Sequence, residues 1–153
     1  MKWLKVGVLA VSAIGSMMFA PSAKGIANGN LTVAVDGLKN QKGQVCLTVF
    51  SSSRGFPKQS DRAVAVQCVK LAGNRPVVTF QNLKAGSYAV AVIHDINNDK
   101  VINTNAIGIP TEGFGFSRNP RVLTGPPKFG DSSVLVAGAD TQIEVRLQYL
   151  LGG

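Results

Sequence analysis

Apolar and polar residues alternate along most of the chain, and this two-residue period is typical of β-strands. The alternation is clearest in residues 142–149, where Ile143, Val145, Leu147 and Tyr149 would face the interior. Similar patterns predict six further strands. They cover residues 31–36, 45–50, 63–71, 77–80, 86–93 and 133–136. The chain after residue 27 shows almost no helical period.

Short strands separated by Gly, Asn and Pro turns predict an all-β fold, specifically a seven-stranded antiparallel β-sandwich of transthyretin/Ig-like type. Residues 37–43 would form the hairpin turn between the first two strands. Residues 95–131 show no clear strand and would form one long loop between strands five and six. Such a long irregular stretch is uncommon in a compact domain and is often functional.

The N-terminus has the features of a secretory signal peptide. Lys2 and Lys5 flank the start of an apolar run over residues 6–20, and small residues follow. We therefore expect a signal peptide over residues 1–27, cut after Ala23 or Ala27, and a single domain over residues 28–153. The run is short for a membrane span, so an uncleaved anchor is the weaker alternative. A periplasmic or secreted protein without a stable membrane span is expected.

The charge of the chain does not suggest a nucleic-acid ligand. The formal net charge is +8, and removal of residues 1–27 takes away three lysines and no acid, which leaves +5. The basic residues are dispersed, as on an ordinary solvated surface. They could also favour contact with anionic envelope surfaces.

Cys46 and Cys68 are the two cysteines of the chain. In an exported domain an even number of cysteines suggests a disulfide, and these two would lie on the second and third strands. We therefore expect a Cys46–Cys68 bond across neighbouring strands.

A candidate metal site follows the fifth strand, in the stretch HDINNDKVINTNAIGIPTEGFGFS, which covers residues 94–117. Asp95, Asn97, Asp99, Val101 and Asn103 match the first nine positions of a calcium-binding loop of the EF-hand type. Four of these residues offer side-chain oxygens, and the position of Val101 uses a backbone carbonyl. The pattern makes calcium a possible cofactor.

Two positions of this loop depart from the calcium-binding pattern. Lys100 stands where glycine is usual, and Ala106 stands where a bidentate acid is usual. Glu112 could replace that acid if the chain folds back, and Asp131 could reach in from the far end of the loop. Any calcium site would therefore be weak. The alternative is a turn in which Asp and Asn side chains bond their own backbone.

Three phenylalanines in the long loop and the single histidine form a second candidate site. If Phe114, Phe116 and Phe129 are exposed, they would indicate a module that binds a sugar, a peptide or another envelope component. If they are buried, they would indicate a scaffold or structural role. His94 shares the face of Tyr88. A histidine at such a position is more often a structural residue whose ring is hydrogen-bonded than a residue that binds a ligand.

The sequence does not predict an enzyme. It contains no G-x-S-x-G motif and only one histidine to serve as a base. The least favoured alternative is a hydrolase that uses Asp95 and Glu112 as paired carboxylates. A binding or structural module of the cell envelope is the preferred interpretation.

Two motifs resemble known families. The stretch VTFQNLKAGSYAV, residues 78–90, resembles a hairpin of transthyretin-like and CnaB-like sandwiches. The H-D-x-N stretch at residues 94–97 and the later E-G-F-G-F-S at residues 112–117 resemble an exported, uncharacterised bacterial family, domain-of-unknown-function family 2141. Lys100 and Asn103 depart from that family's usual Gly and Asp, which weakens a cation-binding role inferred from the resemblance.

Overall fold

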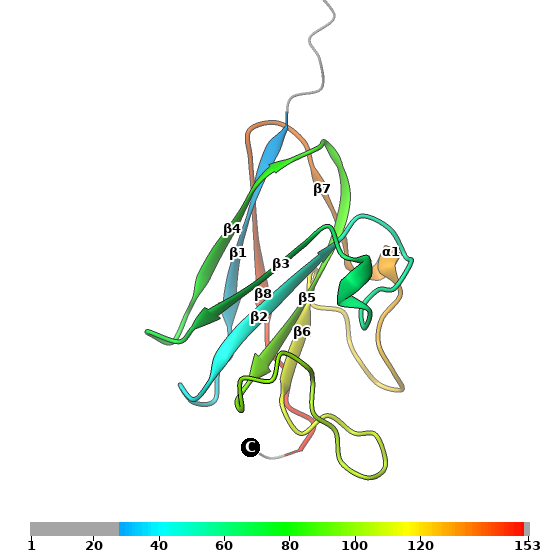
Figure 1. Cartoon of the computed structure of the whole chain (residues 1–153). Coiled ribbons are helices and arrows are strands. Elements are labelled where there is room, and N and C mark those ends of the chain that lie inside the picture. The colour runs from blue at the N-terminus through cyan, green and yellow to red at the C-terminus, as the bar shows by residue number, and fades with distance from the viewer. Residues whose placement is uncertain (1–27, 152–153) are drawn as a thin grey trace, which may run out of the picture.

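The computed structural model describes residues 28–151, which form eight strands, one 3-10 turn and one short helix (Figure 1). The predicted signal peptide and its cleavage after Ala23 or Ala27 lie outside these residues. The strands are β1 (Gly29–Asp36), β2 (Gln44–Phe50), β3 (Ala65–Lys70), β4 (Val77–Leu83), β5 (Gly86–Asp95), β6 (Gly113–Phe116), β7 (Ser133–Val136) and β8 (Asp140–Arg146). The 3-10 turn is η1 (Ser60–Arg62), and the helix is α1 (Phe129–Ser132). No helix in residues 28–151 is long and apolar enough to cross a membrane.

The strands form two sheets. The smaller sheet has the order β4-β1-β8, and the larger has the order β3-β2-β5-β6, with β7 also paired to β5. In Figure 1 the larger sheet lies in front of the smaller one. β1 and β8 run parallel, whereas all other strand pairs are antiparallel. The prediction of seven strands, all antiparallel, is therefore wrong in strand number and in this one pairing.

One apolar core lies between the sheets, and the two-residue period explains it. Leu31, Val33 and Val35 alternate with half-buried residues along β1 and are fully buried. They share this core with buried residues of the larger sheet, namely Val45, Leu47, Val49, Val90 and Val92. Burial of each such side chain contributes about 1.5–3 kcal/mol before the entropy cost of folding.

Two connections run from one sheet to the other, although the sequence predicted a hairpin at each of them. Residues 37–43 lead from β1 in the smaller sheet to β2 in the larger one, and Lys84 and Ala85 lead from β4 to β5 in the same direction. The alternation that predicts each strand does not say which neighbour it pairs with. The hairpin prediction for residues 37–43 is therefore wrong.

The predicted long loop contains a strand. β6 pairs with β5 through Ala91↔Phe116 and Ile93↔Phe114. Its glycines are required by close packing: a Cβ on Gly113 would lie 2.5 Å from the ring of Tyr149, and one on Gly115 would lie 2.8 Å from the Arg146 carbonyl. The expectation that residues 95–131 lack a strand is therefore wrong.

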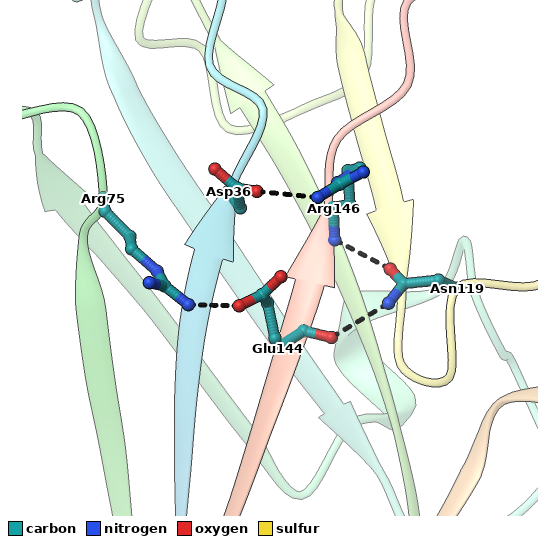
Figure 2. A network of polar contacts seen from close by, with 5 residues as sticks. All are labelled: Asp36, Arg75, Asn119, Glu144 and Arg146. Atoms are coloured by element: carbon teal, nitrogen blue, oxygen red, sulfur yellow. Dashed lines mark hydrogen bonds and ion pairs between the residues drawn. The ribbon is translucent and has the colours of Figure 1, made fainter.

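The C-terminal segment closes one side of the molecule. The Gln148 N–H donates to the Phe114 carbonyl at 2.7 Å, and the Phe114 N–H donates to the Gln148 carbonyl at 3.0 Å. Farther along the same edge, the Asn119 amide donates to the Glu144 carbonyl and accepts from the Arg146 N–H, as Figure 2 shows. These contacts link β8 and the residues after it to β6 and the loop that follows it.

The predicted disulfide is confirmed. Cys46 and Cys68 are direct partners in the antiparallel pair of β2 and β3, and they are bonded to each other.

Candidate functional site

The outer face of the larger sheet carries a hollow of about 860 Å³, which we call the outer trough. It is lined by residues of β2, β3, β5 and β6 and by loop residues within 57–60, 100–110 and 122–126. Small-molecule sites commonly have volumes of about 300–1,000 Å³. The outer trough is therefore large enough for a small ligand.

The floor of the outer trough consists of two rows of side chains that run across the strands. Directly paired residues of neighbouring strands point to the same face of a sheet. The pairings give one row of Cys68, Cys46, Ile93 and Phe114, and a second row of Val66, Thr48, Ala91 and Phe116. Because Thr48 and Ala91 are small, the middle of the second row is low.

β5 shows why this outer face is apolar. Residues 88–92 are all buried, so both faces of the strand are covered. The sequence signal for this was the unbroken run of apolar residues from Tyr88 to Ile93. A strand with one solvated face would alternate instead. The sequence reasoning missed the floor of the outer trough because it followed only the inward-facing positions.

The walls expose apolar side chains to solvent. Val101 is 57% exposed and Leu123 is 85% exposed, while Val66 at the edge of the floor is 52% exposed. Scattered exposed apolar residues are ordinary, but a contiguous group around a hollow is typical of a binding surface.

Asp95 fixes the start of the wall formed by residues 100–110. Its side chain is fully buried, and its oxygens accept hydrogen bonds from the N–H groups of Asp99 at 3.1 Å and Lys100 at 2.9 Å. The Gln44 amide donates to the same carboxylate at 2.7 Å. A buried carboxylate requires such donors. Asp95 thus organises the turn that carries Lys100, whose φ is +65°.

Glu112 fixes the other end of this wall. One carboxylate oxygen accepts from the Ile96 N–H at 2.8 Å, and the other accepts from the Asn103 N–H at 2.9 Å. The chain therefore folds back so that Glu112 contacts the loop. Both oxygens accept hydrogen bonds from backbone N–H groups, as do those of Asp95. These two carboxylates therefore stabilise the conformation of the loop.

The remaining residues of the candidate metal site meet at the exposed tip of the loop. The amides of Asn97 and Asn103 both donate to one oxygen of Asp99 at 2.9 Å, and the Val101 N–H donates to its other oxygen at 3.0 Å. The hydrogen bond from Asn103 is the largest of the effects that hold the pKa of Asp99 below its ordinary value, followed by those from Val101 and Asn97. Asp131 lies in α1, where it accepts from the Lys128 N–H.

Within residues 28–151, no three His, Cys, Asp or Glu side chains gather in a metal-binding group. A cation at the tip would need amide oxygens as well as carboxylates. Rotation of the Asn97 and Asn103 amides would present their oxygens to the position that their nitrogens now occupy.

His94 lies inside the core and does not line the outer trough. It is fully buried, and its ring nitrogens lie 2.8 Å from the Tyr149 hydroxyl and 2.8 Å from the Lys42 carbonyl. These are contacts of a structural residue.

The three phenylalanines of the predicted ligand site form a second apolar cluster. Phe114 and Phe116 are buried, and Phe129 is partly buried beside them. Phe56 packs edge-on against Phe116 and Phe129, with ring centroids 5.9 and 6.0 Å apart. Phe114 and Phe116 still contribute to the floor of the outer trough. They form an apolar base there, with little of their own surface exposed.

The fold and this face define a two-sheet β protein with an apolar hollow on the larger sheet. Residues 33–144 match the model of the family described as "Uncharacterized protein conserved in bacteria (DUF2141)", and the chain belongs to this family. No curated protein and no solved structure matches the chain.

Proposed function

We propose that the chain is a non-catalytic binding module of the bacterial cell envelope, built on a β-sandwich and exported to the periplasm or the cell exterior. The outer trough is its ligand site, and its ligand has an apolar portion. The observation that carries this proposal is a hollow of about 860 Å³ with an apolar floor. The Cys46–Cys68 disulfide is compatible with an oxidising compartment.

The hydrogen-bonded wall of residues 100–110 supports a binding function in preference to a catalytic one. Asp95 and Glu112 are committed to backbone N–H groups, and His94 is enclosed in the core. A wall that is ordered before the ligand arrives reduces the entropy cost of binding. An apolar ligand fits this site better than a sugar, which would need more polar contacts.

A neutral fluorescent probe, N-phenyl-1-naphthylamine, tests the proposal. We expect saturable binding with increased fluorescence for the unaltered chain. Thr48→Phe would fill the low part of the floor and abolish this binding. Thr79→Phe is the matched control, because Thr79 is exposed on β4 of the other sheet. Absence of saturable binding to the unaltered chain, or equal loss in both variants, would contradict the proposal.

A weak calcium site at the loop tip is a second candidate function. The side chains of Asn97, Asp99 and Asn103 gather at this tip, and this supports the proposal because rotation of the two amides would turn their oxygens toward a cation beside Asp99. Melting temperatures in calcium, magnesium and EDTA test it, since a ligand of the folded state raises stability. We expect a rise specific to calcium that Asp99→Ala removes. Asp99 is suited to this test because it is exposed and its replacement leaves Asp95 in place. An unchanged melting temperature at millimolar calcium would reject the site.

A further inference from the structure

Among the described residues, the charged side chains that line the outer trough are all positive. Among the described residues, its lining includes Lys58 and Lys100 and no Asp or Glu. Both lysines are exposed. The trough therefore combines an apolar floor with positive charge at its margin.

The two lysines lie toward opposite ends of the larger sheet. Lys58 is in the segment that follows β2, and Lys100 is in the turn that follows β5. β2 and β5 are antiparallel neighbours, so the segments after them leave at opposite ends, as Figure 1 shows. An elongated ligand that lies along the strands would meet a lysine at either end.

Acids close to these lysines in sequence have other partners. Asp99 accepts hydrogen bonds from Asn97, Asn103 and Val101, and Asp61 lies 3.8 Å from Arg62. Within residues 28–151, neither Lys58 nor Lys100 takes part in an ion pair. Their charges are therefore available to a ligand.

We infer that the ligand of the outer trough is a single-chain anionic amphiphile of the fatty-acid type. Its apolar chain lies over Thr48 and Ala91, and its carboxylate meets Lys58 or Lys100. This inference rests on the proposed function and adds the charge and shape of the ligand.

Calorimetric titration with three ligands that each carry a ten-carbon chain tests the inference: decanoate and decyltrimethylammonium, each below its critical micelle concentration, and decanol below its solubility limit. We expect decanoate to bind about tenfold more tightly than decyltrimethylammonium at low salt, as two exposed charge contacts allow. High salt should reduce this preference, because exposed charges are screened.

The variant Lys58→Gln/Lys100→Gln should weaken decanoate binding about three- to tenfold and weaken decanol binding by a smaller factor. Lys70→Gln/Lys84→Gln removes the same charge outside the outer trough and is the matched control. Equal binding of the three ligands, or equal losses in the two double variants, would overturn the inference and leave the proposed function intact. Absence of binding by all three ligands, and by the neutral probe, would overturn both.

Discussion

The Nδ1 atom of His94 lies 2.8 Å from the hydroxyl of Tyr149, and this contact joins the end of β5 to the C-terminal segment, residues 147–151. The Lys42 carbonyl near Nε2 can only accept a hydrogen bond. In the neutral ring, Nε2 therefore carries the hydrogen, and Nδ1 accepts from the Tyr149 hydroxyl.

Tyr149→Phe should lower the free energy of unfolding by about 1–3 kcal/mol, because it leaves the buried Nδ1 of His94 without a donor. Urea denaturation measures the change. Tyr88→Phe is the control: the Tyr88 hydroxyl donates to the Lys84 carbonyl at 2.7 Å, and Lys84 is exposed, so water can replace that bond. A loss no greater than that of the control would contradict the role assigned to Tyr149.

Tyr149 should also make stability fall at alkaline pH. Burial raises its pKa above the ordinary value of 10.0, against a smaller opposing effect of the Lys39 N–H. The unfolded chain then loses this proton at a lower pH than the folded chain, so the stabilisation is complete below about pH 10 and is lost as pH rises through the folded pKa. Denaturation between about pH 9 and 11 should show a steeper decline for the unaltered chain than for Tyr149→Phe. Parallel declines would exclude Tyr149 as the source.

Gly113→Ala should destabilise the protein by about 1–3 kcal/mol through overpacking. The added Cβ would lie 2.5 Å from two carbons of the Tyr149 ring, which is held by His94. Gly130→Ala is the matched control, since a Cβ there meets nothing within 4 Å. Thermal denaturation of the two variants compares them directly, and equal melting temperatures would show that Tyr149 can move aside without cost.

The sequence predicted the strands of the core more successfully than their pairing. Alternation identified β1, β2 and β8, because burial on one face leaves a clear period. It missed β6, whose inward positions are glycines that make room for Tyr149 and Val145. That packing comes from β8 and from the residues that follow it, so it cannot be predicted from residues 113–116 alone.

The candidate site was predicted in part. The acidic residues of the loop were identified from their spacing, and Asp95, Asp99 and Glu112 do contact the same loop. The spacing could not show that Asp95 and Glu112 turn toward backbone N–H groups. The outer trough depends on cross-strand rows and on loops far apart in sequence, so it needed the three-dimensional arrangement.

Asn103→Ala should raise the pKa of Asp99 toward its ordinary value of 3.8, because the amide of Asn103 is the largest cause of the lowered pKa. In the unaltered chain, the stabilisation from Asp99 is present above pH 3.8 and is lost as pH falls through the lower folded pKa. Carbon NMR of the Asp99 carboxyl during acid titration measures the shift. Asn105→Ala is the control, since Asn105 bonds the N–H groups of Ile107 and Ile109. An unchanged Asp99 titration in Asn103→Ala would contradict the assigned cause.

Asn119 should contribute more to stability than the ion pair between Arg75 and Glu144, which Figure 2 also shows. Its amide bonds the Glu144 carbonyl at 3.1 Å and the Arg146 N–H at 2.7 Å, and its φ is +49°. Asn119→Ala loses both bonds, and alanine adopts the left-handed conformation less readily than asparagine, for an expected loss of about 1–2 kcal/mol. Arg75→Gln breaks the exposed pair with Glu144 and should cost about 0–1 kcal/mol.

Asn119→Gly separates the two contributions of Asn119. This substitution removes the side-chain amide, but glycine adopts a positive φ readily. The variant should therefore be more stable than Asn119→Ala and less stable than the unaltered chain. Urea denaturation of the three proteins gives the order. If Asn119→Gly matches the unaltered chain, the amide does not hold the edge of β8, and the loss in Asn119→Ala reports only the backbone conformation.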